Sequence, residues 1–190
     1  VGDSMFAALT MLQELFLGSN AITRVDPKAF ESQSSLRELQ LRDNPMEHLD
    51  PQTFVPLASL RELRLRNMRL TSIDKNFFAS NTRLRRVDLD QNQLTSLPAN
   101  LFRGLTVLER LSLRDNMVTR MPTNLFAPLS QLSYLALDRN RIAAMGAGDF
   151  ASLSNLRFLA LSANPLGSLS SDIFSALTRL TNIQLHTCSL

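Results

Sequence analysis

The residues best able to perform acid–base or metal chemistry are few in this chain, and they are not grouped. His48 and His186 share no register with a nucleophile or with clustered carboxylates, and Cys188 lacks the further ligands that a zinc site requires. The stretch Gly146–Gly148 resembles the start of a phosphate-binding loop, but it does not lead from a strand pattern into a helix pattern. The sequence therefore predicts no catalytic residue, no metal site and no cofactor.

Charged side chains, by contrast, recur at fixed places along the chain, where they could bind a ligand through ion pairs. Eleven of the 18 arginines and nine of the 17 acidic residues occupy five places of a 24-residue period. The planar guanidinium of arginine suits bidentate contacts to carboxylates. One alternating run, Arg66, Asp90, Arg114 and Asp138, is expected to pair across neighbouring strands, each exposed pair contributing about 0.2–1 kcal/mol.

Two aromatic residues predict a second kind of contact on the same face. Tyr134 and Phe158 are one period apart, next to Ala136 and Ala160, and exposed aromatic side chains often anchor protein interfaces. The alternative is that the two rings only support each other. The candidate ligand-binding residues are therefore Arg64, Arg66, Arg86, Asp88, Asp90, Arg110, Arg114, Tyr134, Asp138 and Phe158.

A leucine at every 24th residue defines the elements that must position these side chains. Leucine occupies positions 12, 36, 60, 84, 108, 132, 156 and 180 without an insertion or deletion, and such a period indicates a solenoid. In the fourth copy, Val87 and Leu89 are two residues apart and so share one face of a short strand, whereas Arg86 and Asp88 point the other way. Successive strands run in the same sense and are expected to pair in parallel.

Two further columns accompany the leucines. Asparagine occupies the ninth place of six copies, and phenylalanine recurs at one phase from Phe6 to Phe174. We expect the amides to satisfy backbone groups after each strand, and the rings to stack on the side opposite the strands. Met68 lacks an amide at the asparagine place, so we predict a local weak point or a bound water there. Cys188, at the same place, is expected to be a buried structural thiol.

The phrase at 84–94 follows the pattern L-x-x-L-x-L-x-x-N-x-L, with Val87 at the second leucine, and it resembles the leucine-rich repeat family. The resemblance implies an α/β solenoid: a right-handed horseshoe with a parallel β-sheet on its concave face and irregular or short helical turns on its convex face. The phenylalanine phase is similar to the typical 24-residue subclass of Toll-like, Slit-like, chaoptin-like and variable-lymphocyte-receptor ectodomains. It implies a non-enzymatic module of an extracellular innate immune receptor or adhesion protein that binds a macromolecule through the concave face.

The repeats indicate one domain, 1–190, with a partial repeat (1–11), seven full repeats (12–179) and a second partial repeat (180–190). The resemblance implies terminal caps. Neither is present here, so we expect a fragment of a longer ectodomain. No apolar run reaches the roughly 18 residues that cross a bilayer, and the first residues do not begin a secretion signal, so this segment is expected to make no membrane contact. A structural spacer or an intracellular scaffold with its binding site elsewhere is the alternative.

The charge balance favours a protein ligand over a nucleic acid. The net charge is only +3 despite a pI near 9.7, and basic residues are interleaved with acidic ones rather than forming a stripe for a phosphate backbone. Some receptors that the chain resembles bind RNA, so an RNA ligand stays open as a minor alternative. A homodimer is also open, since nothing in the sequence selects for or against it.

Overall fold

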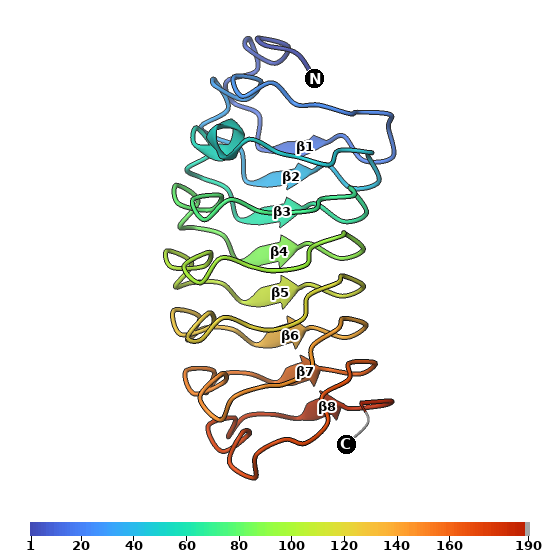
Figure 1. Cartoon of the computed structure of the whole chain (residues 1–190). Helices are drawn as coiled ribbons and strands as arrows, with labels where there is room; N and C mark the ends of the chain where they lie inside the picture. The colour runs from blue at the N-terminus through green and yellow to red at the C-terminus, as the bar shows by residue number, and fades with distance from the viewer. Residues whose placement is uncertain (189–190) are drawn as a thin grey trace.

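The computed structural model describes residues 1–188 and has eight short parallel strands in one sheet (Figure 1). The strands follow one another in the sheet in chain order, and each pairs with the next in a register of 24 residues, as Leu39 with Leu63. Their bounds are β1 (Glu14–Phe16), β2 (Glu38–Gln40), β3 (Glu62–Arg64), β4 (Arg86–Asp88), β5 (Arg110–Ser112), β6 (Tyr134–Ala136), β7 (Phe158–Ala160) and β8 (Asn182–Gln184).

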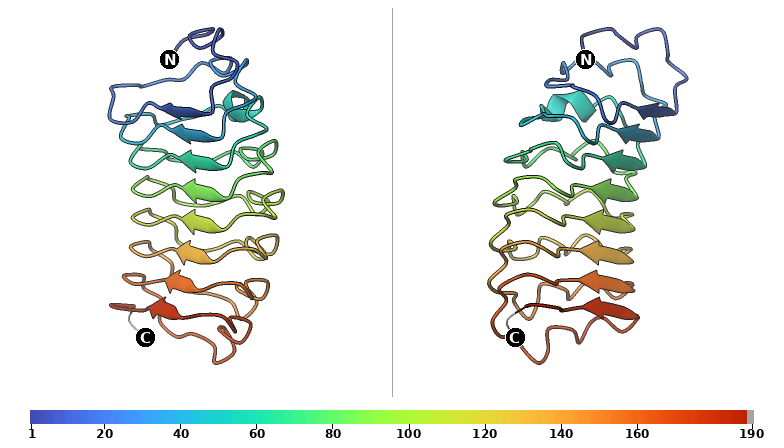
Figure 2. Two further views of the ribbon diagram at one scale, coloured as in Figure 1. Left: turned by 180° about the vertical axis from the view of Figure 1, so that it is seen from behind. Right: turned by 90° about the vertical axis from the view of Figure 1, so that its right-hand side faces the viewer.

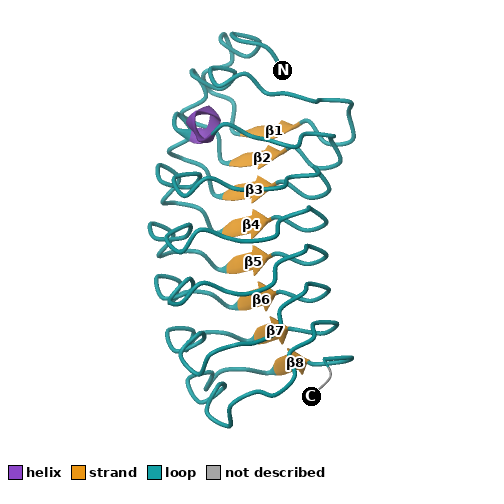
Figure 3. Cartoon of the chain, viewed as in Figure 1, coloured by secondary structure: helices purple, strands orange, loops and turns teal. Residues whose placement is uncertain are grey.

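The sheet lines one side of the stack, and turns line the other (Figures 2 and 3). Among the described residues, the only regular helix is the 3-10 helix η1 (Pro51–Phe54), which begins after Asp50. The Asp50 carboxylate accepts the N–H of Gln52 at 2.8 Å, and a proline suits the first helical turn because its missing N–H would have no partner there. The predicted solenoid with short helical turns opposite a parallel sheet is confirmed. Along residues 1–188, no helix has the length and apolarity needed to cross a membrane.

The core lies between the sheet and the turns and is built from the predicted columns. The middle residue of each inner strand is buried, as are the leucines that open the copies from Leu36 to Leu156, while Leu12 and Leu180 at the two ends are partly buried. On the turn side, Phe78 stacks on Phe102 with ring centroids 5.9 Å apart. Between Phe54 and Phe78 the ring of Phe77 intervenes, 4.9 Å and 5.0 Å from its two neighbours. The predicted phenylalanine stack is therefore present, with one extra ring inserted into it.

The asparagine column satisfies backbone groups as predicted. The Nδ2 atom of Asn116 donates to the carbonyl oxygens of Leu89 (3.0 Å) and Leu113 (3.1 Å), and its Oδ1 accepts the N–H of Leu94 (3.1 Å). This amide thus joins its own coil to the preceding one. Because Asn116 is only 6% exposed, water cannot replace these bonds cheaply.

Met68 interrupts this column and changes the backbone around it. Its side chain is fully buried but offers no acceptor to the N–H of Met46, which bonds to the carbonyl of Asn44 at 2.8 Å instead. The next residue, Arg69, has a φ of 65°, in the left-handed region that ordinary residues avoid. The weak point stays a prediction, and this rearrangement is its structural basis.

Cys188 replaces asparagine at the last place of the column. The thiol is buried, as predicted, and its Sγ lies 3.2 Å from the carbonyl oxygen of Leu161. The N–H of Leu166 bonds to the carbonyl of Asn164 at 2.9 Å, as Met46 does to Asn44. Where the amide is missing, the chain therefore makes the same substitute bond.

A left-handed residue precedes every member of the asparagine column. Eight residues, 24 apart, have φ between 52° and 58°: Ser19, Asp43, Asn67, Gln91, Asp115, Arg139, Ala163 and Thr187. The N–H of Gln91 donates to the carbonyl of Arg114 at 2.8 Å, so inter-coil bonding continues beyond the strands. This left-handed turn directs each chain segment away from the sheet.

Candidate functional site

The outward side chains of the strands form columns, because each strand lies in register with the next. The first residues of the eight strands make one such column, which we call the first-position column. From β1 to β8 it contains Glu14, Glu38, Glu62, Arg86, Arg110, Tyr134, Phe158 and Asn182. Charges that look interleaved along the chain are sorted here into an acidic, a basic and an aromatic section.

Ion pairs within the sheet occupy the acidic section. Arg64 pairs with Glu62 and lies 3.5 Å from Glu38, so its guanidinium is held by internal carboxylates. Arg86 is more loosely held, with an oxygen of Glu62 3.6 Å from its Nη1 and 56% of its side chain exposed. Among the described residues Arg110 makes no ion pair, so Arg86 and Arg110 are the two cations of this column that a ligand could approach.

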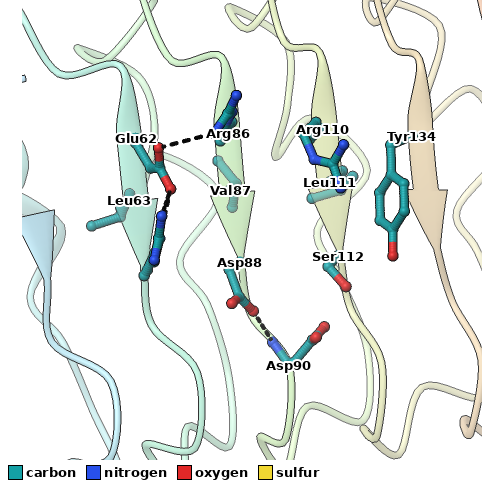
Figure 4. A pocket seen from close by; sticks show the side chains of 11 residues that line it. Glu62, Leu63, Arg86, Val87, Asp88, Asp90, Arg110, Leu111, Ser112 and Tyr134 are labelled. Atoms are coloured by element: carbon teal, nitrogen blue, oxygen red, sulfur yellow. Dashed lines mark hydrogen bonds and ion pairs between the residues drawn. The ribbon is translucent and has the colours of Figure 1, made fainter. Parts of the chain in front are cut away.

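A hollow of about 370 Å³ lies over strands β3 to β6 (Figure 4). It brings together six of the ten candidate residues: Arg64, Arg86, Asp88, Asp90, Arg110 and Tyr134. Glu62 and Ser112, which the sequence did not single out, also line it. The Oγ atom of Ser112 is buried and has no hydrogen-bond partner, so the floor of the hollow contains an unused polar group.

The aromatic section is a close stack. The rings of Tyr134 and Phe158 are 4.5 Å apart and 5° from parallel, and the guanidinium carbon of Arg110 lies 4.2 Å from the Tyr134 ring centroid. The cation over the ring face is held by the ring quadrupole. Ala136 and Ala160 are buried, contrary to the apolar surface expected from them, because their small side chains lie below their neighbours. The apolar surface here is limited to the two rings.

The alternating charges that follow the strands pair only in part as expected. Arg114 donates to Asp138 at 2.8 Å, as expected, and the side chain of Asp138 is only 5% exposed. Asp90 accepts the backbone N–H of Arg114 at 2.8 Å, and Arg66 donates to the side chain of Gln91 at 3.0 Å rather than to Asp90. The expected Arg66–Asp90 pair is therefore wrong, since Asp90 turns toward the next coil.

Partial burial changes the ionisation of Asp90. It raises the pKa of this carboxyl to about 6, and the Asp88 carboxylate acts in the same direction. The Ser112 hydroxyl, nearby but outside hydrogen-bond geometry, and the Arg114 backbone and side chain oppose the shift. One wall of the hollow therefore changes charge just below neutral pH.

The arrangement is suited to binding. Within residues 1–188, no three histidine, cysteine or acidic side chains are grouped as metal ligands would be. The hollow and the ring stack instead offer accessible guanidinium groups, carboxylates and partly exposed aromatic surface. A leucine-filled solenoid with a face of variable side chains defines a class of repeat proteins that generally bind protein or other ligands and are generally not enzymes.

Comparison with known proteins identifies the family. The family model described as "Leucine rich repeat" matches residues 10–70, 58–118, 82–142 and 130–190. The chain belongs to the leucine-rich repeat family. A search of curated proteins returned no match.

Two solved structures show the same architecture at low sequence identity. A chain of the TLR13–ssRNA13 complex is 28% identical, with a TM-score of 0.88 over 95% of this chain and 26% of its own length. A leucine-rich repeat protein of Leptospira interrogans is 27% identical, with a TM-score of 0.87 over 96% of this chain and 45% of its own length. This chain thus spans about a quarter of the first protein and less than half of the second.

Proposed function

We propose that this chain is a recognition module that binds a protein ligand through its strand face, as part of an extracellular receptor or adhesion protein. The single observation that carries the proposal is the sorted first-position column, in which two loosely held arginines meet a partly exposed aromatic stack. Family membership supports a binding role, and the likeness to a chain of the TLR13–ssRNA13 complex supports the receptor context.

The ten candidate residues take different parts in this proposal. The residues that contact the ligand are Arg86, Arg110, Tyr134 and Phe158, because they are at least partly exposed and have few internal partners. Arg64, Arg66, Arg114 and Asp138 hold the surface in shape through ion pairs and hydrogen bonds, while Asp88 and Asp90 form the acidic wall of the hollow.

The choice of a protein over a nucleic acid depends on the acidic side chains. The TLR13 structure contains ssRNA13, so the comparisons do not support the expectation that nucleic acid is excluded. On this face, however, Glu14, Glu38, Glu62 and Asp88 flank the arginines, and a phosphate chain would approach carboxylates as well as guanidinium groups.

Alanine substitution of the aromatic stack tests the proposal. We expect Tyr134→Ala and Phe158→Ala each to weaken a protein binder selected against this chain by about tenfold or more, because central aromatic residues dominate interface energies. Binding is measured by surface plasmon resonance, and circular dichroism checks the fold of each variant. The control is Val55→Ala, which truncates an exposed apolar side chain at the end of η1, on the turn side. Unchanged affinity in both aromatic variants would contradict the proposal.

A further inference from the structure

The inference concerns the two arginines at the centre of the first-position column. Arg86 of β4 and Arg110 of β5 are Cα partners in the sheet register, so two like charges stand directly opposite each other. Such a pair destabilises a sheet unless something neutralises it. Among the described residues, Glu62 is the one carboxylate in an ion pair with either arginine. It lies 3.6 Å from Arg86 and also pairs with Arg64.

The surroundings of this pair provide a shaped place for a small anion. Stacking on Tyr134 fixes the position of the Arg110 guanidinium, which reduces the conformational entropy that a ligand contact would cost. The hollow lies beside both guanidinium groups, whereas Ser112 lies level with Asp88 at its acidic end (Figure 4). Two guanidinium forks match the oxygens of a single carboxylate.

We propose that Arg86 and Arg110 together bind one carboxylate side chain of a protein segment, whose neighbouring apolar side chain packs on Tyr134 and Phe158. This rests on the proposed function and names the chemistry of its ligand. Strands about 4.8 Å apart place the ring stack roughly 10 Å from the midpoint of the arginines, which an extended segment spans in about three residues. The ligand motif is therefore an acidic residue with an aromatic or aliphatic residue two or three positions away.

The acidic wall selects the carboxylate of a protein over a nucleic-acid backbone. Asp88 makes no ion pair among the described residues and lies two residues from Arg86 on the same strand, at the other end of the hollow. One carboxylate bound between the arginines keeps clear of this wall. A continuous phosphate chain crossing the hollow would meet both Asp88 and Asp90, and Asp90 is ionised at pH 7.4.

A display selection tests the motif. Short random peptides on phage are selected at pH 7.4 against the wild-type chain, against Arg86→Gln combined with Arg110→Gln, and against Arg86→Glu combined with Arg110→Glu. Arg103→Gln is the matched control, because Arg103 is exposed on the turn side and belongs to no ion pair among the described residues. Urea unfolding of each protein confirms that the variants are folded.

The outcomes separate this inference from the proposed function. Acidic–apolar peptides enriched on wild type, weakened about tenfold or more by the double glutamine variant and replaced by basic peptides on the double glutamate variant would support it. Selected peptides without an acidic residue, or ones that the glutamine variant binds as well as wild type, would overturn it. If those peptides still require Tyr134 and Phe158, the proposed function stands. If they depend on no strand-face residue, both proposals fail.

A second binding experiment tests single-stranded RNA as the alternative ligand. A pool of random single-stranded RNA is presented to the same proteins under the same conditions. We expect no retention that depends on Arg86 and Arg110. RNA binding that the double glutamine variant loses, without any acidic peptide motif, would assign the arginines to phosphate and overturn the inference.

Discussion

At the residue scale, the buried asparagine amides are the side chains whose removal has the most predictable effect. We expect Asn116→Met, which copies the natural break at Met68, to lower the free energy of unfolding by about 1–3 kcal/mol, because the N–H of Leu94 loses its acceptor. Urea unfolding followed by circular dichroism measures the change. Asn20→Met is the matched control, since Asn20 is exposed and its amide bonds only to carbonyls of its own coil. Equal losses in the two variants would contradict this account.

Asp90 gives the chain a predictable pH dependence of stability. Its folded pKa of about 6 lies above the ordinary value of 3.8, so its ionisation opposes folding. The part of the folding stability that requires a protonated Asp90 is fully present below about pH 4 and is lost as the pH rises through 6. At pH 7 the loss is on the order of 1–2 kcal/mol after allowance for partial exposure.

The variant Asp90→Asn isolates this effect. We expect the stability of wild type relative to Asp90→Asn to rise as the pH falls from 7 to 4, because the asparagine still accepts the Arg114 N–H but does not titrate. Urea unfolding at a series of pH values measures it. A difference between the two proteins that stays constant with pH would show that Asp90 ionises normally.

At the scale of elements, the coil around Met68 is the place where the repeat is least regular. We expect the backbone amide of Met46 to exchange with deuterium faster than that of Leu94, because the Met68 side chain offers Met46 no acceptor whereas Asn116 offers one to Leu94. Native-state hydrogen exchange followed by mass spectrometry measures this. Equal or slower exchange at Met46 would show that burial of the Met68 side chain compensates for the lost bonds.

The strands and columns could be predicted from the sequence because their period has no interruption. Leu89 and Leu113 must face inward in any parallel stack of 24-residue coils, and the amide of Asn116 has few other roles at a buried turn. The left-handed residue before each amide was not predictable from residue type, since Arg139, Ala163 and Thr187 favour other conformations and only the fixed turn geometry imposes it.

The site was less predictable than the fold, because it depends on which side chains are already paired. The sequence places Arg64 and Arg110 on the same face, but only the structure shows that Arg64 is held by Glu62 and that Arg110 lies over Tyr134. The sorting of the first-position column was visible in the sequence once residues 24 apart are read together. Ser112 carried no such signal, because one serine among charged residues indicates no burial.

At the scale of the whole molecule, the solenoid consists of coils that contact only their neighbours. We expect deletion of residues 101–124, one full period, to leave a folded chain in which Arg86 of β4 lies opposite Tyr134 of β6. Deletion of residues 101–112, half a period, is the control, since it leaves one coil with 12 extra residues that have no neighbouring strand to pair with, and it should disrupt cooperative unfolding. Circular dichroism and urea unfolding distinguish the two, and failure of both deletions would mean that coils depend on more than their neighbours.

The constant length of the coils also bears on how such a chain can change over generations. Since no coil carries an insertion, an unequal crossover between two copies of the coding repeat yields a chain whose buried residues still stack in register. What such an event alters is the order of outward side chains: it can separate the arginine pair, duplicate it, or bring an acidic coil beside the rings. Recombination can therefore generate new binding specificities on this fold while the packing of the buried core stays the same.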